Sequence, residues 1–469
     1  MAAVVLAAGL VASVSDWYVA IGLPDPGALT EHGLTVSRVV AEIGSVLCLG
    51  SLLFAAFLVP PQRSGTLAVD GYAAVRMASW SASLWCLGAL LSVPFTVADT
   101  YGRPVTGVLA PRALADLVPS VDQAVAWLVA AVVAAVVAVG CRLTLTWRPT
   151  VTLLVLAVGG VVPLGISGHS SSGGAHDLAT NSLLLHLVAA SLWVGGLVAL
   201  LAHARRRGDH LGLAAARFSA VALACWLVMG ATGVINALVR LPPSELLTGS
   251  YGLLVLAKIA ALVGLGVVGY LQRVRGVRAV RESGSGRALI RLASVEMLVM
   301  FATIGIAAAL SRTPPPARVG PPPSVTELRL GYPVDGPPAV SALLFQWRFD
   351  LIFGTAAIVL AGAYLLGVRR LRARGDVWPI GRTVAWLCGC ATILLATSSG
   401  IGRYAPAMFS MHMVSHMLLS MLAPILLVLG GPVTLALRAL PATGSDHPPG
   451  PREWVVALVH SPVTRVLTH

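Results

Sequence analysis

The sequence predicts an all-α protein, a polytopic bundle of transmembrane helices. Its 469 residues are 57% hydrophobic and only 11% charged, whereas soluble domains have about 25% charged residues. Apolar stretches of about 20 residues, the length that crosses a bilayer, recur along the chain. The net charge of +13 is distributed in short clusters between these stretches, so it sets membrane topology and forms no nucleic-acid-binding face. We expect the lipid bilayer as a partner and no nucleic acid.

The apolar windows indicate twelve full spans and a partial thirteenth. The thirteenth begins near Trp454, and the others lie at about residues 3–22, 38–59, 73–97, 120–141, 150–167, 179–202, 216–239, 251–271, 288–310, 346–367, 379–398 and 407–430. Every second loop is rich in arginine, which predicts a cytoplasmic N-terminus. No cleavable signal peptide is expected, because no basic region precedes the first apolar stretch. We predict a multi-pass protein of the plasma (inner) membrane.

A proline-dense segment divides these spans into two modules. Residues 311–345 contain the run SRTPPPARVGPPPS, and proline favours extended backbone over helix. We expect a linker there on the outer side, between a membrane module at 1–310 and a second one at 346–469. Because the chain ends within its thirteenth span, we expect the second module to be incomplete.

Methionine and histidine are concentrated in the stretch MFSMHMVSHMLLSM, residues 408–421. It holds five of the ten methionines and two of the eleven histidines of the chain. Met408, His412 and His416 are spaced i, i+4, i+8, which places them on one stripe of a helix. A second stripe, about 100° away, consists of Met413, Met417 and Met421.

Imidazole and thioether groups together favour copper, Cu(I) especially. We therefore predict a copper site in the outer leaflet, where the twelfth span begins. Its candidate ligands are His412, His416, Met408, Met411 and Met413. The alternative is that the methionines fill packing gaps and the histidines bond to neighbouring helices.

Two polar residues lie near this stretch. Asp350 is predicted at the depth of His412, where it would orient an imidazole or supply a carboxylate. An ion pair of Asp350 with Arg348 or Arg403 explains it equally well. Tyr404 precedes the cluster by four residues, and we include it as a candidate that supports the ligands or lines a pathway to them.

The first module has outer histidines of its own. His169 and His176 flank a Ser/Gly-rich loop, and His186 enters the sixth span with Trp193 seven residues later on the same face. Together with Asp177, the three histidines are candidates for capturing a metal as it arrives. A solvated loop residue is the alternative for His169 and His176.

Three charged residues lie inside predicted spans: Glu42, Lys258 and Glu296. Charges in the membrane interior are costly and usually have a partner or line a pathway. Lys258 is the only lysine of the chain, and Glu296 approaches from the opposite side within reach of its ammonium by snorkelling. A purely structural ion pair is the alternative to a pathway.

This sequence resembles two protein families. The stretches HLVAASLWVGGLVALL (186–201), ARFSAVALACWLVMGATGVINALVRL (216–241) and SYGLLVLAKIAALVGLGVVGY (250–270) resemble the CopD copper-resistance membrane domain, clearly from about residue 180. The stretch from WRFDLIFGTAAIVLAGAYLLGVRRL (347–371) through SSGIGRYAPAMFSMHMVSHMLLSMLAPILLVLGGPVTLALRALP (398–441) resembles CtaG, a cytochrome c oxidase assembly factor. The CtaG resemblance is the more specific, since it covers consecutive motif residues.

These resemblances imply copper binding at the outer face and support of copper delivery to cytochrome c oxidase during its assembly. Oxidase subunits or an outer copper chaperone are the partners they imply. The residues would act as ligands, so we expect no enzymatic turnover. Two alternatives stay open: a permease that imports copper along Glu42, Lys258 and Glu296, and a haem-binding membrane cytochrome.

Overall fold

The computed structural model describes most of the chain, and every regular element in that part is helical. The described residues are 24–167, 175–241, 243–247, 249–276, 290–291, 293–300, 303, 306, 324–334, 336–442, 449–461 and 464. Among them, the only β-type pairing is an isolated bridge between Thr66 and Thr146. The prediction of an all-α protein is confirmed.

Ten helical segments in the described residues are long and apolar enough to cross a membrane. They are Ala28–Leu58, Val69–Thr100, Asp122–Leu143, Trp147–Ile166, Asp177–Arg205, Leu211–Arg240, Tyr251–Val274, Phe353–Ala373, Ile380–Tyr404 and Phe409–Ala439. Each coincides with one of the predicted windows. The window at 3–22 lies outside the described residues, and the window at 288–310 is described only in part. The chain is a multi-pass membrane protein, whereas the total of spans and the side of the N-terminus stay predictions.

The chain divides into two compact units. Unit 1 comprises residues 1–171 and 182–320, and unit 2 comprises residues 172–181 and 321–469. The short segment 172–181, which precedes and begins α8 (His176–Arg205), thus belongs to the same unit as the C-terminal part of the chain. The boundaries predicted at 310 and 345 stay a prediction.

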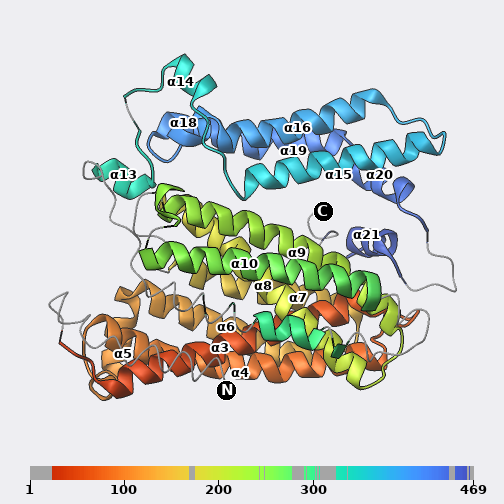
Figure 1. Cartoon of the computed structure of the whole chain (residues 1–469). Helices are drawn as coiled ribbons and strands as arrows, with labels where there is room; N and C mark the ends of the chain where they lie inside the picture. The colour runs from red at the N-terminus through yellow and green to blue at the C-terminus, as the bar shows by residue number, and fades with distance from the viewer. Residues whose placement is uncertain are drawn as a thin grey trace. The chain divides into compact units, whose positions relative to one another are not determined.

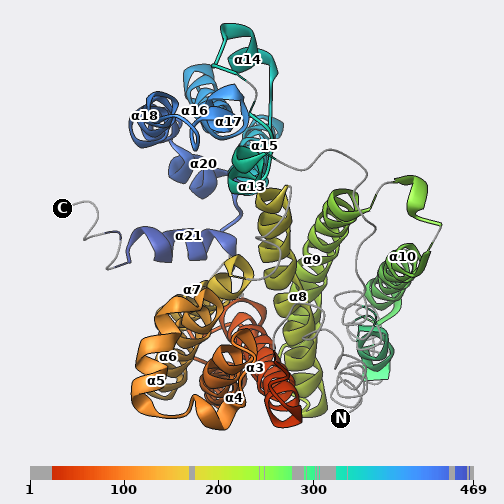
Figure 2. The ribbon, with the colours of Figure 1, turned by 90° about the vertical axis from the view of Figure 1, so that its left-hand side faces the viewer.

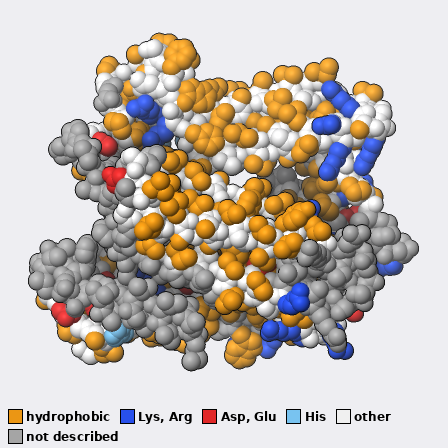
Figure 3. Space-filling model, viewed as in Figure 1, with side chains coloured by type: hydrophobic (Ala, Val, Ile, Leu, Met, Phe, Trp, Pro, Cys, Tyr) orange, Lys and Arg blue, Asp and Glu red, His pale blue; other side chains and the backbone are white. Residues whose placement is uncertain are grey.

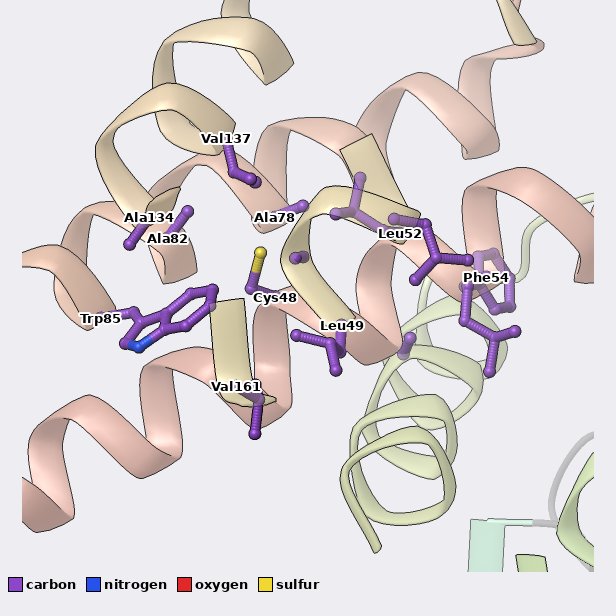
Figure 4. Close-up of a cluster of buried hydrophobic side chains, with 14 of the residues drawn as sticks. Cys48, Leu49, Leu52, Phe54, Ala78, Ala82, Trp85, Ala134, Val137 and Val161 are labelled. Atoms are coloured by element: carbon purple, nitrogen blue, oxygen red, sulfur yellow. The ribbon is translucent and has the colours of Figure 1, made fainter. Parts of the chain in front are cut away.

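In unit 1, four helices pack around a core of small and aromatic side chains. These helices are α3 (Ala28–Leu53), α4 (Val69–Thr100), α6 (Asp122–Leu143) and α7 (Trp147–Ile166), and they lie side by side in one group (Figure 2). Cys48 and Trp85 are fully buried, and side chains from all four helices meet around them (Figure 4). The short helix α5 (Pro111–Leu117) connects α4 to α6.

Close helix contacts in this unit depend on glycine. A Cβ on Gly44 would come within 2.5 Å of the Trp85 backbone nitrogen, and one on Gly88 within 2.5 Å of the Ala41 nitrogen. A Cβ on Gly50 of α3 would overlap the backbone of Gly195 in α8. Membrane helices lack a hydrophobic driving force toward each other, so small residues that permit close packing hold them together.

The same unit presents apolar side chains outward. On α9 (Leu211–Arg240), Leu227 and Leu238 are exposed, and on α10 (Gly249–Leu271), Val263 and Val267 are exposed. Hydrophobic side chains cover the visible face over these two helices (Figure 3). Such a surface suits contact with lipid tails rather than with water.

Unit 2 contains α15 (Phe353–Ala373) and α16 (Ile380–Ser398), which pack side by side (Figure 1). The short helices α13 (Val325–Leu330) and α14 (Val340–Phe345) lie toward one end of this pair (Figure 1). The short helix α17 (Gly400–Tyr404) follows α16 and packs on α14, whereas α20 (Pro432–Ala439) packs on α15, and α21 (Pro451–Val459) packs on α20. The helix α21 lies where the partial thirteenth span is predicted, near Trp454, and that span stays a prediction.

The predicted twelfth span is not one regular α-helix. It consists of α18 (Phe409–Met417), a π-helical turn η7 (Leu418–Leu422) and α19 (Ala423–Leu429). All three pack on α16. Gly431 then adopts a left-handed backbone conformation with φ of 60° and separates α19 from α20, which glycine does without steric cost.

Candidate functional site

His412 and His416 lie on one face of α18, as their spacing predicts. Both side chains are exposed, and together with Ser415, Leu419 and Ser420 they line a shallow groove. Their ring centroids are 6.5 Å apart. In this histidine groove the two imidazoles are therefore neighbours on one exposed face, and their joint binding of a metal ion stays a prediction.

Hydrogen bonds fix the face of α18 that carries these histidines. Ser415 lies between them in sequence, is buried, and donates through Oγ to the carbonyl oxygen of Ala396 in α16 at 3.0 Å. His416 Nδ1 and the Ser420 hydroxyl are 3.5 Å apart. The bond from Ser415 joins the buried side of α18 to α16, and the histidines lie on the exposed side.

Three of the methionines line a different groove from the one that the two histidines line. Met413, Met417 and Met421 line a second groove with Val414, Leu418, Leu422 and Ile425, as the second predicted stripe implies. Met413, a predicted ligand, belongs to this methionine groove. Met411 is half-buried on α18.

Met408 stands at the N-cap of α18, with an extended backbone at φ −137° and ψ 125°. Its carbonyl oxygen accepts the His412 amide at 2.9 Å. Met408 thus lies one turn before the histidines, at the end of the predicted stripe.

Asp350 and Tyr404, which are predicted to support the metal ligands, have structural roles in this unit. Oδ1 of Asp350 accepts the amides of Ile352 at 3.0 Å and Phe353 at 2.6 Å, which caps the start of α15. No contact between Asp350 and His412 is present among the described residues. Tyr404 is 1% exposed, and its carbonyl oxygen accepts the Met408 amide at 2.9 Å. Both residues support the helices around the histidine groove.

The start of α8 is bound to segments of unit 2 that are predicted to face outward. Arg348 donates to both carboxylate oxygens of Asp177, from Nε at 2.8 Å. The Arg348 guanidinium also lies 4.2 Å from the centroid of the Tyr332 ring, and the Ala175 amide donates to the Gly331 carbonyl oxygen at 2.5 Å. We call Ala175, Asp177, Gly331, Tyr332 and Arg348 the outer clamp.

The outer clamp continues toward the histidine helix. The Tyr332 hydroxyl donates to the Arg403 carbonyl oxygen at 2.8 Å, and Arg403 Nη2 donates to the Pro333 carbonyl oxygen at 2.7 Å. Burial raises the pKa of Tyr332, and the nearby Arg348 guanidinium opposes part of that rise. Arg403 belongs to α17, directly before α18. Arg348, one of the two arginines predicted as ion-pair partners of Asp350, thus pairs with Asp177 instead.

In unit 1, His186 is part of a polar network between α8 and α9. Its Nδ1 lies 3.0 Å from the Thr232 hydroxyl. One turn further along α9, Asn236 donates from Nδ2 to the Ser182 hydroxyl at 2.6 Å and to the Thr232 carbonyl oxygen at 3.1 Å. The half-buried Lys258 of α10 lies within electrostatic range of His186. Four polar side chains therefore lie together inside an apolar bundle.

Trp193 and Glu296, predicted on separate spans, are in contact. Nε1 of Trp193 donates to Glu296 Oε1 at 3.0 Å, and Glu296 is 1% exposed. Its second oxygen, Oε2, has no hydrogen-bond partner in the described part of the chain. The hydrogen-bond partner of Glu296 is thus Trp193, and no ion pair between Lys258 and Glu296 is present among the described residues. The Glu42 side chain is exposed on α3, with no described contact to either residue.

Two predicted ligands fall outside what the structure describes. His169 lies in the segment 168–174, and the side chain of His176, the first residue of α8, is not described either. Among the described residues, no group of three or more His, Cys, Asp or Glu side chains forms a metal cage. The predicted three-histidine site around the outer loop stays a prediction.

Sequence reasoning missed several residues that hold these sites. Thr232 and Asn236 are spaced i, i+4 in GATGVINAL, inside an otherwise apolar span, and this polar pair was the available signal for an interhelical bond. The Asp177–Arg348 pair joins residues 171 positions apart. No local pattern predicts that pair.

The chain is similar along its whole length to proteins of mycobacteria. Uncharacterized proteins of Mycobacterium bovis and Mycobacterium tuberculosis are each 34% identical over 472 residues, covering 100% of this chain and 68% of theirs. An uncharacterized protein of Mycobacterium leprae is 32% identical over 469 residues, covering 97% of this chain and 67% of its own. No solved structure matches this chain significantly.

Three family models match in succession. The first, copper resistance protein D-like N-terminal domain, matches residues 29–177, and the second, copper resistance protein D, matches residues 212–310. The third, cytochrome c oxidase caa3 assembly factor, matches residues 362–469. The chain belongs to the CopD–CtaG fusion family. The resemblance stated from the sequence is confirmed, and it extends further toward the N-terminus than residue 180.

The matches divide the candidate sites of this CopD–CtaG protein. His412 and His416 lie within the CtaG match, Thr232, Lys258 and Glu296 lie within the CopD match, and Asp177 ends the N-terminal match. The family descriptions associate the fusion protein with copper and with oxidase assembly, and neither names a catalysed reaction.

Proposed function

We propose that this CopD–CtaG protein binds copper, as Cu(I), at the outer face of the plasma membrane and supports its delivery to cytochrome c oxidase during assembly. The observation that carries this proposal is the groove in which His412 and His416 stand 6.5 Å apart, in the part of the chain that matches the oxidase assembly factor. Oxidase subunits or an outer copper chaperone are the partners that this function requires.

The ligand chemistry supports copper as the cargo. Imidazole is a borderline ligand and thioether a soft one, a combination that suits Cu(I) better than hard cations. Met408 precedes the histidines by one turn, and Met413, Met417 and Met421 line the adjacent groove. Both grooves are open to the surface, which permits transfer of an ion to another protein.

The outer clamp supports a common role for the two family regions. Asp177 ends the part that matches the CopD N-terminal domain, and its partner Arg348 lies near the start of the second module. His176 is the residue before Asp177. A metal captured by the outer loop would therefore arrive on a segment attached to unit 2.

The test is copper binding by the purified full chain and by its His412→Ala/His416→Ala variant. We expect the variant to lose copper and cells that contain it to assemble less active oxidase, because the groove loses both imidazoles. His32→Ala, which removes an exposed histidine on α3, is the matched control and should bind copper normally. Unchanged copper content in the double variant would contradict the proposal.

A second candidate function is copper import by unit 1. The polar network of Ser182, His186, Thr232 and Asn236 favours it, because polar groups inside a bundle often line ion pathways. Glu296 and Lys258 would extend that pathway. The sequence predicts Glu42 as a third charged residue of this pathway, but its side chain is exposed on α3.

Import predicts that cytoplasmic copper depends on this network. Asn236→Leu and Glu296→Gln should reduce copper uptake severalfold, whereas Ser294→Ala, at an exposed serine near Glu296, should not. If deletion of the gene lowers oxidase activity and leaves cytoplasmic copper unchanged, import is wrong and delivery is favoured.

A further inference from the structure

Arginine side chains gather at one end of unit 2. Residues 369–382 contain five arginines and one acidic residue, Asp376, and Arg438 lies on the adjacent α20. All six arginines are exposed: Arg369, Arg370, Arg372, Arg374, Arg382 and Arg438. Lys and Arg side chains are visible at this end of α15 and α16 in Figure 3. The end of the unit therefore has a strong positive charge at its surface.

Two of these arginines share one aromatic ring. The guanidinium carbons of Arg382 and Arg438 lie 5.2 Å and 5.8 Å from the centroid of the Trp378 ring. Both distances are within the range of cation–π attraction. The ring thus brings together two guanidinium groups that come from helices 56 residues apart in sequence, although like charges repel.

The ring itself is firmly held. Nε1 of Trp378 donates to the Tyr364 hydroxyl at 3.1 Å, and that hydroxyl donates to the Gly430 carbonyl oxygen at 2.7 Å. Tyr364 also stacks on Trp386, with ring centroids 5.0 Å apart. Trp378 is only 3% exposed. The two arginines therefore lie on a rigid aromatic platform, which lowers the entropy lost when they bind a ligand.

The local acidic group neutralises little of this charge. Asp376 lies 3.4 Å from Arg438, and both side chains remain over 40% exposed. An exposed ion pair of this kind contributes little to stability. Arg382 has no carboxylate partner among the described residues. The pair of guanidinium groups is accordingly available to an anion from outside.

Apolar groups beside the arginines point to a lipid. Val377 is 83% exposed and Ile380 is 70% exposed, and both adjoin the start of a segment that is apolar enough to cross the membrane. On α20, Leu435 and Ala439 are buried whereas Val433 is 43% exposed. Inorganic phosphate would gain no contact with such an apolar surface, whereas the acyl chains of a phospholipid would pack against it.

We propose that Arg382 and Arg438, held on Trp378, form a binding site for the phosphate of an anionic phospholipid. Guanidinium groups bind phosphate oxygens through paired hydrogen bonds, and two of them together match the charge of a headgroup. The arginine distribution predicts that this end faces the cytoplasm, where basic clusters beside membrane helices attract anionic lipids. The remaining four arginines supply the general attraction.

The experiment measures lipid binding by the full chain. Purified protein is titrated with phosphatidylglycerol or phosphatidylcholine in mixed micelles, and bound lipid is counted by native mass spectrometry. We expect retention of phosphatidylglycerol over phosphatidylcholine, and at least tenfold weaker retention in Arg382→Gln/Arg438→Gln. Inorganic phosphate in excess should leave the bound lipid in place.

Matched variants separate a specific site from general charge. Arg369→Gln/Arg370→Gln removes the same charge from arginines that make no described contact with Trp378, and it should change lipid retention less than threefold. Arg382→Lys/Arg438→Lys keeps the charge, loses the paired hydrogen bonds, and should bind at least threefold more weakly than the native chain. Equal losses in the two glutamine variants, full binding in the lysine variant, or displacement by phosphate would each overturn the proposal.

Discussion

Polar side chains inside and beside apolar helices are the residues on which the candidate functions depend. Three of them have a hydrogen-bond partner on a neighbouring helix: Ser415 bonds to Ala396, His186 to Thr232, and Trp193 to Glu296. A polar group in the membrane without a partner is costly. At the residue scale, these bonds determine which way the histidines, the tryptophan and the glutamate point.

The outer clamp allows a test of one such bond. Arg348→Gln removes the guanidinium that donates two hydrogen bonds to Asp177. The variant should lower the free energy of local opening by roughly 1 kcal/mol, because the ion pair is only partly buried. That loss corresponds to about fivefold faster hydrogen exchange at the Ala175 amide, which donates to Gly331. Hydrogen-exchange mass spectrometry of the peptides around residue 175 measures it.

The controls for this prediction come from the same unit. The charge-reversed pair Asp177→Arg/Arg348→Asp should restore much of the protection, and Arg372→Gln, at an exposed arginine without a described ion pair, should leave it unchanged. Loss of protection in the Arg372 variant as well would mean that the effect is global destabilisation.

At the scale of the element, glycine decides how closely α3 and α8 approach. A Cβ on Gly195 would overlap the carbonyl oxygen of Val46 and the backbone of Gly50. Gly195→Ala should therefore destabilise the protein by about 1–3 kcal/mol, as overpacking does, and lower the midpoint of thermal unfolding in detergent. Gly159→Ala is the control, because nothing lies within 4 Å of its added Cβ.

The π-helical turn η7 is the second element with a functional consequence. It follows His416 directly and separates α18 from α19. Such turns shift the register of a helix and recur at functional sites. Here the histidine groove extends into η7 through Leu419 and Ser420, and the methionine groove through Leu418 and Met421. The two grooves therefore both cross the irregular part of the span.

At the scale of the whole molecule, the two units correspond to different family regions, with one exception. The exception, called an exchange below, is a short segment from the first part of the chain that belongs to unit 2. The CopD models match within residues 29–310 and the CtaG model within residues 362–469, yet residues 172–181 group with unit 2. The outer clamp accounts for that exchange, because its ion pair and backbone bond are formed by Asp177 and Ala175.

The sequence by itself determined the fold class, the position of ten apolar helices, the succession of family regions, and the shared face of His412 and His416. Hydropathy and helical spacing are properties of contiguous segments, so they can be read without knowing how the segments pack. Only the tertiary structure decided that Asp350 caps α15 and that Met413 belongs to another groove. The same holds for the partners of Glu296 and Asp177, which lie 103 and 171 residues away. Contacts of that kind depend on which helices become neighbours, and small-residue packing across the whole bundle decides it.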